Sequence, residues 1–265
     1  RVRFTAEPAA LPPPVRAPRR VLLCRGAAAR PTVGRAGMLY HELVPGRLGG
    51  ALAAARIRKE RGGPIDDAVH HHRLAAHVLH GRSGWARVAY EGQREPFVLG
   101  AGDTVLQPPT IRHRVLECSD GFEAIEVVCP AEHATCFDAD GVLPTPAELA
   151  DAARTWAGQR FAWHRLSDER PPRRPIVTTG IGTASGGRID VRLFRSEPDQ
   201  PLDATELDAG GTALLFVLRG QFVLRCADET LALGEDDACV LPAGPVTLTA
   251  TWPSSKLLEV RLAVR

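Results

Sequence analysis

The chain has 265 residues, of which 44% are hydrophobic and 24% are charged, and its formal net charge is +2 at pH 7. This length allows one large domain or two domains of about 100–130 residues. The small net charge gives no reason to expect a nucleic acid or an anionic membrane surface as a partner. No stretch approaches the roughly 18 consecutive apolar residues that a membrane span needs, so we expect none.

The first 36 residues differ in composition from the rest of the chain. Residues 1–36 are rich in Arg, Pro and Ala and lack a sustained periodic apolar pattern, which does not make a compact core. Met38 is the only methionine of the chain. We therefore expect a disordered arm over residues 1–36, or sequence upstream of a true start at Met38. The apolar run at residues 21–24 is the one candidate for an added edge strand.

Two later stretches share one layout, which indicates a duplicated domain. Gly84 corresponds to Gly220 and Pro109 to Pro242, at offsets of 136 and 133 residues. Within each copy, short Val- and Leu-rich runs alternate with period two and are separated by Gly, Asp and Pro. This pattern is typical of an antiparallel β-sandwich or barrel. The boundaries predict one barrel over residues 37–140 and another over residues 176–265.

The connection between the copies, residues 141–175, contains the signals of one helix. Thr145, Pro146 and Glu148 form a capping box with proline at the first helical position. We expect the helix to run from Thr145 to about Trp156, with Gly158 ending it. None of the six cysteines lies in a CxxC pair, so we expect reduced thiols in a cytoplasmic protein and no cysteine zinc site.

The candidate functional residues are histidines. His70 and His72 are two positions apart, so on a strand both imidazoles lie on one face and His71 lies on the other. His77 follows five residues later, and His113 comes after a second motif with a Gly-Asp turn. Three or four neutral imidazoles that converge suit a borderline divalent metal such as Fe, Zn, Cu, Ni or Mn.

The other histidines have simpler interpretations. The parity of His80 is opposite to that of His77, so we expect His80 at the surface or at a sheet edge. His41, His133 and His164 lie outside both motifs and have no partner in the sequence pattern. Arg112, next to His113, is interpreted as a surface or interface charge.

The two motifs resemble those of the cupins, with Gly, His-x-His, an acidic residue and Gly in the first, and Gly-Asp, Pro and His in the second. The matching positions are Gly63, His70, His72, His77, Gly84, Gly102, Asp103, Pro109 and His113. The resemblance covers most of residues 38–262 and is strongest to a group of small bacterial cupin proteins. It implies an all-β fold of two tandem cupin barrels (double-stranded β-helices of the jelly-roll type) with a short connecting helix.

The resemblance also implies the metal ligands. His70, His72 and His113 match the three histidine ligands of cupins, and His77 falls where cupins usually carry glutamate. Four neutral ligands would leave a divalent site at a charge of +2, which favours an anionic substrate oxygen such as an enolate or carboxylate. His77 is therefore a fourth ligand or a catalytic base beside three ligands, and both alternatives stay open.

The second copy lacks these ligands. Its corresponding positions are Glu206, Asp208, Ala213 and Val246, and alanine and valine cannot bind a metal. We therefore expect one metal ion per chain, bound by the first barrel.

The leading hypothesis is a non-haem Fe(II) dioxygenase that acts on a small anionic, phenolic or enolic substrate. Zn, Mn, Ni and Cu remain alternative metals. The rival hypotheses are a non-enzymatic cupin that binds or senses a small molecule, and a cupin isomerase or lyase without redox chemistry. The expected partner is a small-molecule substrate, with neither nucleic acid nor membrane, and a homodimer is an open possibility.

Overall fold

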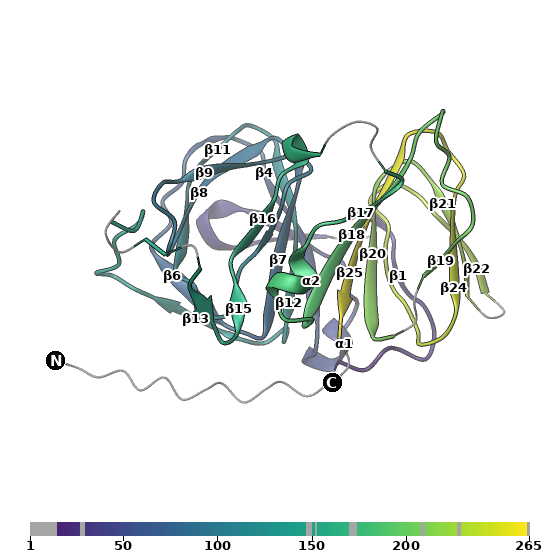
Figure 1. Cartoon of the computed structure of the whole chain (residues 1–265), viewed down its shortest axis with the longest axis horizontal. Helices are drawn as coiled ribbons and strands as arrows, with labels where there is room; N and C mark the ends of the chain where they lie inside the picture. The colour runs from purple at the N-terminus through teal and green to yellow at the C-terminus, as the bar shows by residue number, and fades with distance from the viewer. Residues whose placement is uncertain are drawn as a thin grey trace.

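A computed structural model describes residues 15–26, 30–146, 150–151, 153–169, 174–207, 210–226 and 229–263. Figure 1 shows two β-barrels side by side, the first in blue and teal and the second in green and yellow. Each barrel consists of two antiparallel sheets that pack face to face. The prediction of an all-β, two-barrel fold is therefore confirmed.

The first barrel combines a seven-stranded and a six-stranded sheet. The seven-stranded sheet has the order β16 (Ala162–His164), β10 (Thr104–Leu106), β7 (Ala76–Ser83), β12 (Phe122–Cys129), β4 (Ala53–Lys59), β3 (Leu39–Glu42) and β2 (Pro31–Val33). The other sheet has the order β13 (Ala134–Phe137), β6 (His70–Arg73), β11 (His113–Cys118), β8 (Trp85–Tyr90) and β9 (Phe97–Gly100), with β5 (Gly63–Pro64) also paired to β11.

The second barrel combines a six-stranded and a four-stranded sheet. The six-stranded sheet has the order β1 (Leu22–Cys24), β23 (Ala238–Val240), β20 (Thr212–Arg219), β25 (Ser255–Leu262), β18 (Ile189–Ser196) and β17 (Ile176–Thr178). The four-stranded sheet has the order β19 (Thr205–Leu207), β24 (Val246–Ala250), β21 (Phe222–Cys226) and β22 (Glu229–Leu233).

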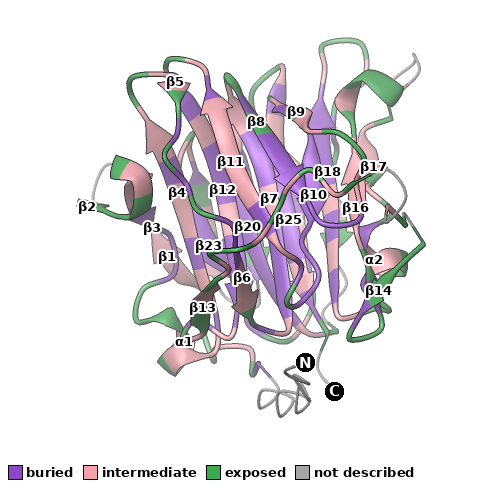
Figure 2. Cartoon of the chain, turned by 90° about the vertical axis from the view of Figure 1, so that its left-hand side faces the viewer, coloured by how far each residue is buried: buried purple, intermediate pink, exposed green. Residues whose placement is uncertain are grey.

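The two barrels join through a shared hydrophobic core. Val78 and Val127 of the first barrel are buried in one cluster with Val191 and Leu258 of the second. Each barrel also has an interior core of its own. Figure 2 shows the buried residues along the strands of this junction, such as β7 and β25. Because side chains alternate along a strand, β7 directs one set of residues into its own barrel and the other set against the second barrel.

The amino-terminal segment corrects one expectation. Residues 1–36 were expected to lie outside the fold, yet Leu23 pairs with Cys239 and Thr32 pairs with Tyr40. Strand β1 thus covers the edge of β23, which removes unpaired backbone groups from that edge. Val15 is 4% exposed in the core between the barrels. Residues 1–14 and 27–29 lie outside the described part of the chain.

The connection between the barrels differs from the helix that was expected there. Residues 147–149 and 152 of the expected helix lie outside the described residues, but its expected end is strand β14 (Thr155–Trp156), paired with β15 (Gln159–Arg160). Ala157 and Gly158 have φ angles of 49° and 75°. Two such residues form the tight turn of a β-hairpin, so Gly158 turns a hairpin instead of ending a helix. The connection does contain the 3₁₀ helix η4 (Leu166–Asp168).

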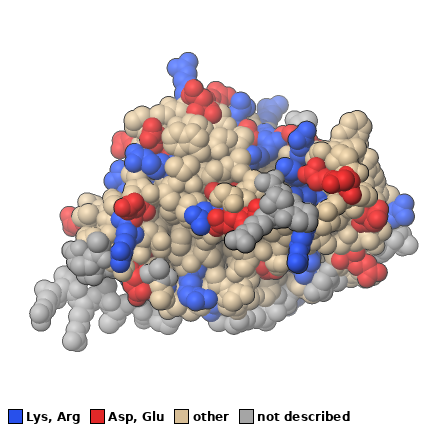
Figure 3. Space-filling model, turned by 45° about the horizontal axis from the view of Figure 1, so that its top comes forward, with Lys and Arg blue, Asp and Glu red and all other residues tan. Residues whose placement is uncertain are grey.

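The remaining helices are short. Among the residues that the structure describes, the other helices with assigned bounds are η2 (Arg35–Gly37), α1 (Arg47–Gly50) and α2 (Ile181–Ala184). Among the described residues, no helix is long and apolar enough to cross a membrane. On the face seen in Figure 3, acidic and basic side chains are interspersed, and no large patch of one sign stands out.

Candidate metal centre

Three histidines meet inside the first barrel. His70 and His72 lie on β6, and His113 begins the neighbouring strand β11, where it pairs directly with His70. One ring nitrogen of each histidine lies within 4.8 Å of one from each of the others. His70 and His113 are buried, and His72 is partly exposed. The structure therefore brings together the three residues that the sequence motifs predicted as ligands.

Hydrogen bonds to main-chain carbonyls orient two of these imidazoles. Nδ1 of His70 lies 2.8 Å from the carbonyl oxygen of Ala68, and Nδ1 of His113 lies 3.0 Å from that of Ile111. A carbonyl oxygen can only accept a hydrogen bond, so both Nδ1 atoms carry the proton. The lone pair of each ring is then on Nε2. Metal-binding histidines are commonly oriented by such bonds to their other nitrogen.

His72 completes the set from a more open position. Its Nδ1 lies 3.0 Å from the hydroxyl oxygen of Thr135 on β13. Burial lowers the pKa of His72 to about 2, and the nearby His77 and His70 add to this effect. Burial is also the main cause that lowers the pKa of His113. Clustered neutral imidazoles are suitable ligands for a borderline divalent metal, so the donor set fits the metal ion that the motifs imply.

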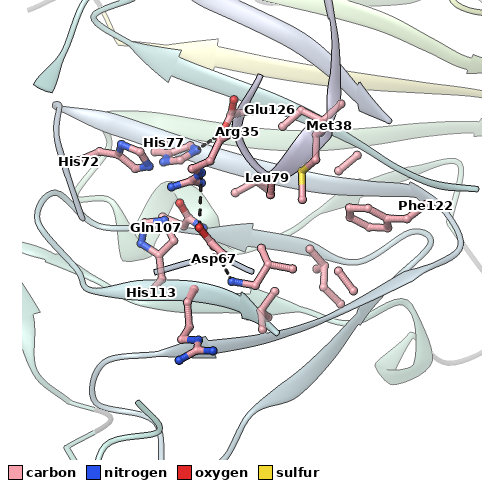
Figure 4. A pocket seen from close by; sticks show the side chains of 18 of the residues that line it. Arg35, Met38, Asp67, His72, His77, Leu79, Gln107, His113, Phe122 and Glu126 are labelled. Atoms are coloured by element: carbon pink, nitrogen blue, oxygen red, sulfur yellow. Dashed lines mark hydrogen bonds and ion pairs between the residues drawn. The ribbon is translucent and has the colours of Figure 1, made fainter. Parts of the chain in front are cut away.

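His77 lies beside these three residues but is engaged elsewhere. It is 2% exposed on β7, and its ring centroid is 5.4 Å from that of His72. Its Nε2 lies 3.0 Å from Oε1 of Glu126 on β12, as Figure 4 shows. Among the described residues, the group of converging ligand atoms has three members and does not include His77. Of the two roles predicted for His77, this arrangement fits the base beside the metal better than the fourth ligand.

Arg35 is a site residue that sequence reasoning missed. It lies on η2, and its Nη1 contacts Nε2 of His70. Its Nε lies 3.6 Å from Oδ1 of Asp67, whose side chain is 2% exposed (Figure 4). The segment that sequence analysis placed outside the fold thus carries a cation into the pocket. No local pattern around Arg35 could have indicated this contact.

The imidazoles adjoin a small, largely apolar cavity of about 50 Å³. Met38, Leu79 and Phe122 line its apolar part (Figure 4). Arg35 and Gln107 are among the polar groups at its wall. A water takes roughly 10–15 Å³ on this measure, so the cavity has room for a molecule of a few heavy atoms.

The remaining candidates fall in different places. His133, expected to have no partner, has its ring 5.2 Å from that of His72. Arg112 pairs with Glu91 at 2.9 Å and does not line the cavity beside the imidazoles. His80 is 3% exposed, so its expected surface position is wrong: the second barrel covers that face of β7.

The second barrel offers no comparable centre. Ala213 and Val246 are buried in its interior core, and Glu206 is exposed on β19. Asp208 lies outside the described residues. In the part of the second barrel that the structure describes, no group of histidines, cysteines or carboxylates converges as a metal site does.

Two barrels of paired antiparallel sheets, with three histidines on adjacent strands of the first, define the two-barrel cupin fold. Solved structures of oxalate decarboxylase from Bacillus subtilis share it. A point mutant of that protein superposes with a TM-score of 0.64 at 14% identity, over 92% of this chain and 78% of the other. No protein-family model and no curated protein matches the chain.

Two further structures of the Bacillus subtilis oxalate decarboxylase are similar to this chain to the same degree. The structure at pH 4.6 has a TM-score of 0.64 at 14% identity, over 92% of this chain and 76% of that one. A structure from a study of the Mn(II) centres of oxalate decarboxylase has the same TM-score and identity, and the match covers 92% of this chain and 78% of the other. At 14% identity the similarity shows the fold alone.

Proposed function

We propose that this protein is a metal-dependent enzyme that holds one divalent ion through Nε2 of His70, His72 and His113 and acts on a small anionic substrate. The proposal depends above all on the two carbonyl contacts at Nδ1, because they direct the lone pairs of His70 and His113 to one point. Among the described residues, Nε2 of His113 makes no hydrogen bond, and Nε2 of His70 contacts Nη1 of Arg35, a contact that a bound ion would replace.

We place the reaction first among O₂-dependent cleavages of enolic or phenolic compounds, with Fe(II) as the metal. In such a reaction O₂ is the oxidant, a carbon–carbon bond breaks, and both oxygen atoms enter the products, so no further cofactor is needed. The ion would supply a Lewis-acidic centre that attracts the anionic oxygen of the substrate. The apolar wall formed by Met38, Leu79 and Phe122 would exclude water.

The pair His77–Glu126 would accept the proton that the substrate loses. Burial raises the pKa of the Glu126 carboxyl, but the hydrogen bond from His77 and the nearby positive charge of Arg35 lower it, and the pKa is lowered overall. An ionised Glu126 accepts the hydrogen bond from Nε2–H of His77, which leaves Nδ1 as the basic nitrogen. His77 could then take a proton from an enol or phenol, and Glu126 would stabilise the resulting imidazolium, as carboxylates do in other His-based sites.

A second candidate is a lyase that removes CO₂ from a small carboxylate. It is favoured by the guanidinium of Arg35 next to His70, because arginine pairs well with carboxylates. The solved structures with this fold also bear the name of a decarboxylase, and one of their titles refers to Mn(II) centres.

The test begins with metal analysis of the purified protein. The metal-free protein is then loaded anaerobically with Fe(II) or Mn(II), and two readouts are followed: O₂ uptake with diketone and phenolic compounds, and CO₂ release from small dicarboxylates. His113→Ala should abolish both metal binding and turnover. His71→Gln, on the same strand as two ligands but on its other face, is the matched control and should change neither. Metal binding without any turnover would favour a sensing or binding protein instead.

A further inference from the structure

A second cavity lies between the two barrels, apart from the metal pocket. Its volume is about 50 Å³, and its wall includes His80 from β7, Arg195 from β18 and Lys256 from β25. His80 and His77 are three residues apart on β7, so their side chains leave opposite faces of the sheet. The cavity is therefore separated from the metal pocket by the sheet itself.

The second barrel carries a row of positive charges, of which Arg195 and Lys256 line the cavity and Arg219 is exposed beside it. Arg195 pairs directly with Lys256 across β18 and β25, and Lys256 pairs with Arg219 across β25 and β20. Directly paired residues share one face of a sheet, and like charges in such positions repel each other. Arg195 is 6% exposed, so little solvent screens its charge.

Few negative groups offset this row. Glu169 contacts Arg195 through both guanidinium nitrogens, with Nη2 at 2.8 Å, and it also lies 3.0 Å from Nε2 of His164. In the described part of the chain, Lys256 and Arg219 form no ion pair. The one carboxylate is thus already shared by two partners, and the cavity keeps a surplus of positive charge.

His80 faces the row from the first barrel with an unused ring nitrogen. Its Nδ1 lies 2.8 Å from the hydroxyl oxygen of Thr104, which is fully buried. Its Nε2 has no hydrogen-bond partner among the residues that the structure describes. If the hydroxyl of Thr104 donates to Nδ1, Nε2 carries the proton and becomes a donor. This nitrogen is accessible from the cavity, so an acceptor bound there could form a hydrogen bond with it.

We propose that the cavity between the barrels binds a small oxyanion: phosphate, sulfate or a carboxylate. Such an ion would accept hydrogen bonds from Nε2 of His80 and Nζ of Lys256 and would offset the repulsion along the row. The volume suffices, because a buried water takes roughly 10–15 Å³ on this measure and the cavity has about 50 Å³. Its ligands come from both barrels, so binding favours the docked arrangement and raises the stability of the whole chain.

The test is the thermal unfolding of the full chain in chloride, phosphate, sulfate and acetate at equal ionic strength and pH. We expect at least one oxyanion to raise the unfolding temperature in a saturable way, and the comparison identifies which. Lys256→Gln should weaken the apparent affinity at least tenfold. In chloride alone the same variant should unfold at a higher temperature than the wild type, because the row of like charges is interrupted.

Arg225→Gln is the matched control, since it removes one positive charge from an exposed residue on β21 and should leave the response unchanged. Arg219→Gln is a second variant in the row and should weaken binding in the same direction as Lys256→Gln. Two results would overturn the proposal. One is stabilisation by the oxyanions no greater than that by chloride. The other is an unchanged response in both Lys256→Gln and Arg219→Gln, which would place the anion elsewhere, for example at the metal centre.

Discussion

Nε2 of His77 lies 3.0 Å from Oε1 of Glu126, across neighbouring strands of the first barrel. The position of His77 is the one where cupins usually carry a glutamate. In this chain the carboxylate is still next to the site, but β12 supplies it instead of β7. A divalent ion would therefore have a negative charge nearby, which reduces the excess positive charge expected for four neutral ligands.

This pairing predicts that His77 acts on the substrate and does not hold the metal. In His77→Ala, we expect the metal content to stay at the wild-type level while kcat falls by about 10²–10⁴-fold, as for loss of a general base. Glu126→Gln should lower kcat in the same direction and also retain the metal. Metal content by mass spectrometry and steady-state kinetics are the two measurements. Loss of metal in His77→Ala would make His77 a ligand after all.

His77→Glu separates the two roles further. The new carboxylate would lie beside Glu126, and the added negative charge should weaken the binding of anionic inhibitors such as azide to the metal-loaded protein. Metal should be retained, because His70, His72 and His113 are untouched. Inhibitor binding as tight as in the wild type would mean that the side chain at position 77 points away from the substrate.

The asymmetry between the barrels predicts one metal ion per chain. The first barrel has three converging histidines, whereas the second has Ala213 and Val246 at corresponding positions. His72→Ala should reduce the bound metal to below about a tenth of the wild-type amount at micromolar metal. His164→Ala removes a histidine that lies outside the pocket and should leave the stoichiometry at one. Two tightly bound ions per chain would refute the single-site model.

The convergence of His70, His72 and His113 could be predicted, because two of them are close in sequence and a second motif supplies the third. A spacing of two puts His70 and His72 on one face of a strand, and the second motif places His113 on the strand beside it. Arg35, Glu126 and His133 could not be predicted in this way. Each comes from a segment that the fold brings to the site from elsewhere in the sequence.

His80 shows a different limit of prediction from sequence. Its parity correctly placed it on the outer face of its own barrel, but that face is covered by the second barrel and His80 is 3% exposed. A strand pattern tells which residues share a face, and it does not tell what packs against that face. The prediction of a helix from Thr145 to Trp156 was wrong for a related reason. Trp156, taken as the end of that helix, is buried against the core of the first barrel as part of a hairpin.

The amino-terminal strands predict that this segment is needed for stability. Removing residues 1–36 would uncover the edge of β23, the core around Val15 and the pocket wall at Arg35. Each buried Val or Leu side chain contributes about 1.5–3 kcal/mol, so we expect the free energy of unfolding to fall by several kcal/mol. The exposed edge should also promote association. Urea unfolding and size-exclusion chromatography are the measurements.

Removal of residues 1–14 alone is the control, because it leaves β1 and β2 in place. A chain that begins near Met38 and equals the wild type in stability, solubility and metal content would restore the simpler interpretation that the arm is dispensable.

The buried His80 predicts a specific loss of stability in acid. Burial lowers the pKa of His80 to about 3, and the charges of His164 and Arg195 add to this effect; the ordinary value is 6.5. The folded pKa is thus below the unfolded one, so the unfolded chain binds more protons between these values. The stabilisation is complete above pH 6.5 and is lost as the pH falls toward 3, at up to about 1.4 kcal/mol per pH unit.

Replacing His80 removes this contribution. When the pH is lowered from 7.5 to 5.0, the free energy of unfolding should fall in both proteins. The decrease should be about 2 kcal/mol smaller in His80→Leu than in the wild type. The measurement is urea unfolding in chloride buffers at both pH values, since a bound oxyanion near Lys256 would stabilise the protonated imidazole and mask the effect. Groups common to both proteins, including the histidines of the metal centre, cancel in the comparison. An equal loss in both proteins would mean that the ring of His80 can be protonated in the folded state, and hence that water or an anion already reaches the cavity between the barrels.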